Sequence, residues 1–202
     1  MEFLHTDLKT LIQIIGYLGI FIFVFAESGL FFGFFLPGDS LLFTAGLLAS
    51  EGYFSLSLII LIAFVAAVAG DSVGYSFGKR MGPLLFNREE SHFFKKSYVK
   101  KSSLFYDKHG SKTIIFARFI PIVRTFAPIL AGTAQMDYRK FLAFNIVGGL
   151  LWTVSLPVLG FLLGQVIPDI DRYILPATLA VVAISFLPVI WQLIKKRTVA
   201  KV

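Results

Sequence analysis

The chain has 202 residues, of which 56% are hydrophobic, with a formal net charge of +7 and a mean hydropathy of +0.79. A soluble domain carries about a quarter charged residues, against 15% here, so this composition excludes a soluble globular domain and predicts an integral membrane protein with a single domain. The absence of cysteine excludes disulfides and thiolate metal sites, and the three histidines lie far apart, so we expect no metal centre and no cofactor.

Three apolar segments fill the first part of the chain. Residues 10–26 are long enough for a short spanning helix, at about 1.5 Å per residue against a hydrocarbon core of about 30 Å. We predict that this helix is uncleaved, because residues 1–10 lack the basic character of a signal peptide. Residues 28–50 are interrupted by Pro37-Gly38, which leaves two arms of about half a bilayer each. We predict a re-entrant hairpin here, with its tip buried in protein or in a wet cavity. Residues 55–72 form the next predicted span.

A basic segment at residues 79–112 separates the two halves of the chain. It carries nine Lys and Arg residues against three acids, and residues 195–201 add four more basic side chains. The positive-inside rule places both regions at the cytoplasmic face, near anionic headgroups, and explains them better than nucleic-acid binding does. Aromatic residues near one face of the basic segment favour a helix on the membrane surface.

The second half repeats the pattern of the first. Residues 113–132 are apolar and broken by two prolines, which predicts a second re-entrant hairpin, and spans are predicted at 141–165 and 174–194. Counting crossings from the cytoplasmic basic segment places both termini inside and opens the two hairpins to opposite faces. The predicted fold is therefore an all-α membrane bundle, residues 1–202, with two oppositely oriented re-entrant hairpins in an inverted repeat.

Two charged clusters of opposite sign lie in or directly beside the predicted hairpins: Glu27, just before the first hairpin, with Asp39 inside it, and Arg118 and Arg124 inside the second. A charge at membrane depth costs roughly 2.5–3.5 kcal/mol on insertion scales, so a chain that keeps four of them is expected to use them. One interpretation is a buried ion-pair lock between the hairpins. The other is a site for a charged substrate, because arginine binds two phosphate oxygens at once and a carboxylate in a low dielectric can take up a proton. A pair that opens for phosphate would satisfy both interpretations.

Other polar positions have simpler explanations. Asp39 and Ser40 could cap the helix that follows the turn. Four glycines at four-residue spacing predict close helix packing, while Asn145 and Trp152 are interpreted as packing or interface residues. The secondary site candidates are Ser40, Asp71, Lys79 and Thr125, and the packing glycines are Gly70, Gly74, Gly78 and Gly82.

Ordered motifs in both halves resemble the DedA family, also called the SNARE-associated or VTT-domain family. They are Glu27-x-Gly29, Phe35-Leu-Pro37-Gly38-Asp39-Ser40, Gly70-Asp71-x-x-Gly74-Tyr75-x-x-Gly78-Lys79 and Phe116-x-Arg118-Phe-x-Pro121-x-x-Arg124-Thr125. The resemblance implies a lipid translocase or scramblase, in a family linked to undecaprenyl phosphate recycling, phospholipid transport and proton motive force. It matches the family's membrane-embedded acids and arginines to Glu27, Asp39, Arg118 and Arg124, and it also implies paired re-entrant hairpins.

The sequence thus predicts a transporter that moves a phosphate-bearing lipid, undecaprenyl phosphate or a phospholipid, across the bacterial cytoplasmic membrane. Arg118 and Arg124 would bind the phosphate, and Glu27 and Asp39 would bind protons or pair with the arginines. The expected partners are membrane lipids, protons and, in a homo-oligomer, further copies of the chain. The alternatives are a proton-coupled ion or drug antiporter and a non-transporting scaffold. We expect no enzymatic activity, since the sequence has no His-Glu-x-x-His motif, no P-loop and no cysteine.

Overall fold

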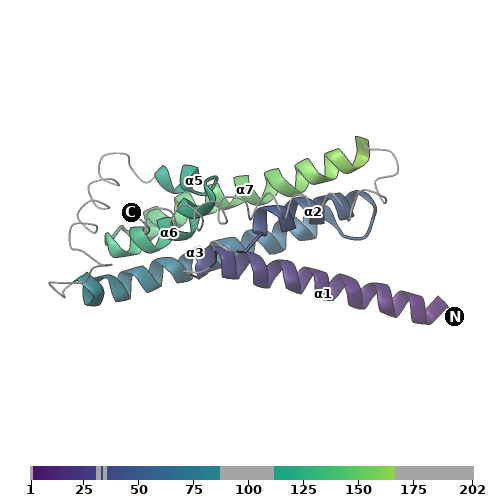
Figure 1. Cartoon of the computed structure of the whole chain (residues 1–202), viewed down its shortest axis with the longest axis horizontal. Helices are drawn as coiled ribbons and strands as arrows, with labels where there is room; N and C mark the ends of the chain where they lie inside the picture. The colour runs from purple at the N-terminus through teal and green to yellow at the C-terminus, as the bar shows by residue number, and fades with distance from the viewer. Residues whose placement is uncertain (1, 31–32, 34–35, 87–111, 167–202) are drawn as a thin grey trace, which may run out of the picture. The chain divides into compact units, whose positions relative to one another are not determined.

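The structure is a computed structural model that describes residues 2–30, 33, 36–86 and 112–166 (Figure 1). In these residues all regular structure is helical, which confirms the predicted all-α class. The predicted span at 174–194 and residues 87–111 of the basic segment lie outside the described residues. The helices are α1 (Glu2–Gly29), α2 (Gly38–Ser50), α3 (Leu56–Phe86), α5 (Thr113–Ala117), α6 (Pro121–Thr133) and α7 (Tyr138–Val166).

Two of the described helices are long and apolar enough to cross a membrane. They contain the stretches Leu56–Gly82, with a mean hydropathy of 2.3, and Tyr138–Val166, with a mean hydropathy of 2.1. A shorter apolar stretch, Ile15–Gly29, lies in α1. Many large apolar side chains on these helices are exposed, as expected for surfaces that face lipid. The re-entrant path of the two predicted hairpins stays a prediction.

The chain divides into two compact units. The first contains residues 1–20, 35–62 and 154–202, and thus includes α2 with the start of α3 and the end of α7. The second contains residues 21–34 and 63–153, and thus includes α5 and α6 with the end of α1, most of α3 and the first part of α7.

In the first unit, α2 packs closely against the end of α7. A Cβ atom added to Gly46 would clash with the backbone of Pro157, and one added to Gly160 would clash with the backbone of Phe43. Because only glycine leaves room for such an approach, these two positions set the spacing of the helices. Pro37 directly precedes α2, so Asp39 lies in its first turn, where the helix dipole favours a carboxylate.

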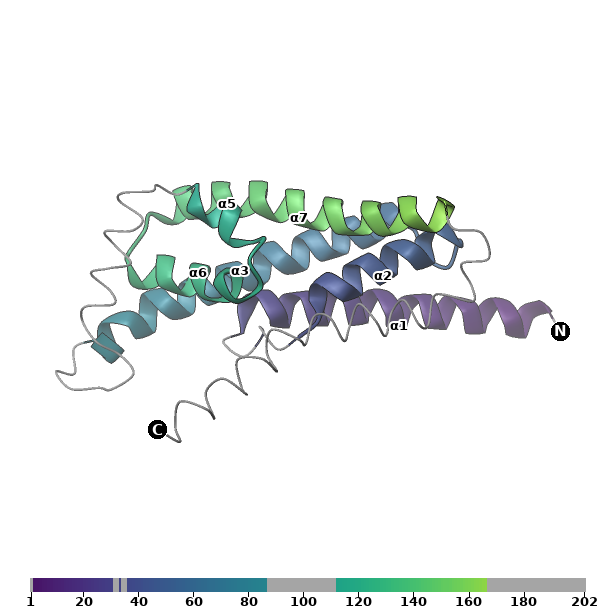
Figure 2. The ribbon, with the colours of Figure 1, turned by 45° about the horizontal axis from the view of Figure 1, so that its top comes forward.

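In the second unit, α3 packs against both α6 and the end of α1 (Figure 2). Three of the four predicted packing glycines face these neighbours at close range: Gly70 faces the end of α1, and Gly78 and Gly82 face α6. Tyr75 lies in the buried core of this unit, where its ring stacks on that of Phe141 with centroids 4.6 Å apart. Its hydroxyl donates to the Met136 carbonyl, which ties α3 to the turn that follows α6.

The break between α5 and α6 has a local cause in the sequence. Pro121 has no N–H group, and its ring excludes helical geometry from the preceding residue. Ile120 accordingly adopts an extended conformation, with φ −113° and ψ 109°, and Pro121 opens α6, where its missing N–H costs nothing. Arg118 therefore lies at the end of α5, just before the break, and Arg124 in the first turn of α6.

Candidate functional site

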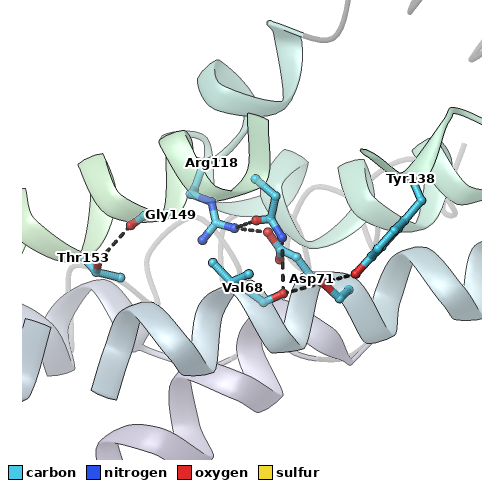
Figure 3. Close-up of polar contacts among 8 residues, drawn as sticks. Val68, Asp71, Arg118, Tyr138, Gly149 and Thr153 are labelled. Carbon is cyan, nitrogen blue, oxygen red and sulfur yellow. Dashed lines mark hydrogen bonds and ion pairs between the residues drawn. The ribbon is translucent and has the colours of Figure 1, made fainter. Parts of the chain in front are cut away.

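Arg118 is held by two acceptors from two different helices. Its Nη2 atom donates to Oδ2 of Asp71 on α3 and to Oδ1 of Asn145 on α7 (Figure 3). The amide nitrogen of Asn145 in turn donates to the Val68 carbonyl, one turn before Asp71, with a donor–acceptor distance of 3.3 Å. Asn145 is completely buried and only 4% of Arg118 is exposed. The result is a closed polar network that joins α3, α7 and the end of α5.

Glycines in α7 make room for this network. A Cβ atom added to Gly148 would lie 3.2 Å from the Cα atom of Ile115, and one added to Gly149 would lie 3.6 Å from Nη1 of Arg118. The α5 segment and its arginine can therefore lie directly on the α7 backbone. Gly149 also accepts a hydrogen bond from the Thr153 hydroxyl, at 2.8 Å (Figure 3).

Arg124 forms the second arginine–carboxylate pair. Its Nη2 atom donates to Oε1 of Glu27 near the end of α1, and only 2% of Glu27 is exposed. The other carboxylate oxygen of Glu27 has no hydrogen-bond partner among the described residues, and the same is true of the buried hydroxyl of Thr125. A buried polar atom without a partner is costly, and such atoms mark places where a proton, a water molecule or a ligand group can bind.

Both arginines converge on one aromatic side chain, Trp152 of α7. The guanidinium carbon of Arg124 lies 4.8 Å from the Trp152 ring centroid, and that of Arg118 lies 6.0 Å from it. Trp152 is buried, with 3% of its surface exposed. Two arginines, each paired with a carboxylate, thus lie near one indole ring within the second unit.

The structure distributes the predicted site residues unevenly. It brings Glu27 together with Arg124, and it pairs Arg118 with Asp71, which the sequence ranked only as a secondary candidate. Asp39 lies instead in the first unit, with the buried Ser40 beside it in the chain. Lys79 is an exposed residue of α3 whose ammonium group lies 6.0 Å from the Tyr75 ring centroid.

Sequence reasoning missed Asn145 and Trp152 as members of the site, because each is a single polar or aromatic position in an apolar span. One signal could have found them. Asn145, Gly149 and Trp152 are spaced at i, i+4 and i+7, which places an amide, a glycine without a side chain and an indole on one helix face. Such a face is unusual in an apolar helix and predicts a polar neighbour.

Ser72 lies at the centre of a Gly-x-Ser-x-Gly pattern at residues 70–74, which in many hydrolases places a nucleophile on a strand-to-helix turn. Here the pattern lies inside α3, and the Ser72 hydroxyl donates to the Val68 carbonyl at 2.7 Å. The described side chains include no histidine that could serve as its base, and they contain no group of three potential metal ligands.

The comparisons with known proteins agree with this arrangement of motifs. The VTT domain model matches residues 36–162. Protein DedA of Escherichia coli (strain K12) is 41% identical over 183 residues, covering 90% of this chain and 83% of that protein. This chain belongs to the DedA family. It is thus a membrane protein, like other relatives. An uncharacterized membrane protein of Mycobacterium tuberculosis (strain ATCC 25618 / H37Rv) is 47% identical over 84% of this chain and 75% of its own length.

A further DedA-family relative bears a location in its name. The inner membrane protein YqjA of Escherichia coli (strain K12) is 35% identical over 74% of this chain and 68% of that protein. No solved structure matches the chain.

Proposed function

We propose that this DedA-family protein moves a phosphate-bearing lipid across the cytoplasmic membrane and that Arg118 and Arg124 bind the phosphate during transport. The observation that carries the proposal is the convergence of both guanidinium groups on the buried ring of Trp152. Trp152 lies at the middle of one long apolar helix, and Asp71 lies close to the middle of the other. Two cations held at this depth suit the anionic headgroup of a lipid in transit.

The arginine–carboxylate pairs indicate how a phosphate would bind, by taking the place of a carboxylate. A phosphate oxygen pair and a carboxylate oxygen pair fit the same planar guanidinium fork, so an incoming phosphate competes with Glu27 and Asp71 for the arginines. A carboxylate left without its arginine would be a buried, unpaired charge, which costs several kcal/mol. Uptake of a proton removes that cost.

Glu27 is suited to this proton uptake, because one of its buried oxygens has no hydrogen-bond partner among the described residues. We therefore include proton coupling in the proposal: phosphate binding to Arg124 would be linked to protonation of Glu27. Asp39, the second predicted proton carrier, would act from the first unit. The apolar tail of the lipid would remain in the bilayer during this exchange.

Reconstitution tests the proposal directly. The full chain is placed in proteoliposomes containing labelled undecaprenyl phosphate in one arm and a labelled anionic phospholipid in the other, and the label that reaches the opposite leaflet is measured. Arg118→Ala and Arg124→Ala should each abolish transport, and the Lys variants should restore it only in part, because lysine keeps the charge and loses the fork. Arg139→Ala is the matched control, since Arg139 is an exposed arginine of α7 outside the site.

The outcome also separates the alternatives. Folded Arg118→Ala and Arg124→Ala proteins that transport lipid like the unchanged protein would contradict the phosphate site. A cation flux driven by a pH difference, in vesicles where no lipid moves, would indicate an antiporter. A protein that moves neither lipid nor ions, yet tolerates exchange of Glu27 with Arg124, would indicate a scaffold.

A further inference from the structure

A groove of about 500 Å³ runs along α3 on the surface of the second unit. It is separate from the arginine site and lies over the last turns of the apolar stretch Leu56–Gly82. Among the described residues, its lining forms two parallel rows of α3: Ser72, Ser76 and Arg80 in the first row, and Val73, Phe77 and Met81 in the second.

The groove exists because its floor is made of small side chains. Ser72 and Ser76 are one turn apart, and each donates its hydroxyl proton to a carbonyl of the preceding turn, at 2.7 Å in both cases. A serine whose donor is already used presents little unsatisfied polarity, so an apolar chain can lie over it. The row beside the floor is apolar and open, with 45% of Val73 and 48% of Phe77 exposed.

A basic side chain, Arg80, lies at one end of the row of serines. Arg80 follows Ser76 by one turn, about 6 Å along the helix axis, and its side chain is exposed. No acidic side chain among the described residues pairs with Arg80. Its position at the end of the apolar stretch is where phospholipid headgroups meet a spanning helix.

We infer that this groove binds one anionic phospholipid of the surrounding leaflet, with its phosphate on Arg80 and an acyl chain along the serine floor. The dimensions agree: from Ser72 to Arg80 the helix rises about 12 Å, close to the depth of one leaflet of a core of about 30 Å. The charge agrees as well, because the exposed guanidinium of Arg80 beside an apolar groove complements a phosphate above a hydrocarbon chain. This lipid is a bound neighbour of the protein, so the inference is independent of the transported substrate.

Native mass spectrometry of the purified full chain can measure this binding. Phosphatidylglycerol and phosphatidylcholine with identical acyl chains are titrated separately, and the fraction of protein carrying one lipid is recorded. Three variants are compared with the unchanged protein. Arg80→Gln removes the cation, Ser76→Phe fills the groove and keeps the charge, and Lys79→Gln makes the same charge change outside the groove. Gel filtration and circular dichroism establish that each variant is folded.

The unchanged protein should bind phosphatidylglycerol more tightly than phosphatidylcholine. Arg80→Gln should weaken phosphatidylglycerol binding about tenfold, as expected for the loss of a charge-assisted hydrogen bond, and remove the preference. Ser76→Phe should weaken the binding of both lipids, and Lys79→Gln should change neither.

Three results would overturn the inference. Equal losses in Arg80→Gln and Lys79→Gln would show that only the overall positive charge attracts the lipid. Unchanged lipid binding in Ser76→Phe would show that the groove is not the site. Dimers that disappear in Ser76→Phe would show that a second copy of the chain occupies the groove.

Discussion

The guanidinium group of Arg124 lies over the indole ring of Trp152, with its central carbon 4.8 Å from the ring centroid. A cation above an indole face is attracted by about 0.5–2 kcal/mol, and more when both groups are removed from water. Arg118 approaches the same ring at 6.0 Å. Both guanidinium groups thus lie near the same indole ring.

This relationship predicts a graded effect of replacing Trp152. Trp152→Phe keeps an aromatic face and should lower the thermal unfolding midpoint in detergent less than Trp152→Leu, which keeps an apolar side chain and loses the face. Transport in proteoliposomes should fall in the same order, because both arginines lose their common support. Equal unfolding midpoints and equal transport rates in the two variants would show that the ring only fills space.

The Glu27–Arg124 pair predicts a strong interaction in a double-mutant cycle. Glu27→Gln or Arg124→Gln alone should lower the free energy of unfolding by about 3–5 kcal/mol, because each leaves a buried charge without its partner. The double variant should regain most of this stability, since no unpaired charge remains. Chemical denaturation in micelles measures all four proteins.

Transport by the same double variant distinguishes a substrate site from an ion pair that is only structural. If the pair only holds helices together, the stable double variant should transport lipid as well as the unchanged protein does. We expect it to be inactive, because the proposed transport requires Arg124 to bind the phosphate and Glu27 to bind a proton. Glu51→Gln supplies the control, as Glu51 is an exposed acid at the end of α2.

Replacing Asn145 is also expected to lower stability, here through lost hydrogen bonds and not through an unpaired charge. Asn145→Leu keeps the approximate volume of the side chain and removes both of its hydrogen bonds, so the buried Arg118 loses its second acceptor, while the Val68 carbonyl keeps the hydrogen bond from the Ser72 hydroxyl. The expected cost is about 1–3 kcal/mol in the free energy of unfolding.

A paired substitution tests what the network requires. Asp71→Asn should impair transport because Arg118 loses its carboxylate, and adding Asn145→Asp returns a carboxylate to the same Nη2 atom from α7. We expect the double variant to recover part of the lost activity. If a folded double variant recovers no transport, the carboxylate that pairs with Arg118 must come from α3.

Part of this architecture could be predicted from sequence because its causes are local. Hydropathy identified the long helices, and Pro121 predicted the break in the second half, whereas Pro128, the other predicted break in the same segment, lies inside α6. The cost of charge at membrane depth singled out both arginines and Glu27, together with Asp39, which lies in the first unit. These inferences need only a short window of sequence, since each depends on the chemistry of neighbouring residues.

The pairing within the site could not be predicted in this way. Asp39 and Asp71 are both single acids near apolar sequence, and only the packing of α3 beside α5 and α7 shows that Asp71 meets Arg118. The same contact turns Asn145 from an ordinary packing residue into a partner of Arg118. Tertiary neighbours, which a single sequence does not contain, decide both assignments.

The glycines of α3 predict opposite outcomes for the same small substitution. A methyl group added to Gly78 would clash with the Ile129 backbone of α6, whereas one added to Gly74 would lie 3.5 Å from its nearest neighbour, the Cβ atom of Pro128. Gly78→Ala should therefore lower the free energy of unfolding by about 1–3 kcal/mol through overpacking. Gly74→Ala should leave it unchanged or raise it slightly, because alanine favours the helix. Thermal unfolding in detergent compares the two variants, and equal midpoints would contradict close packing of α3 on α6 at Gly78.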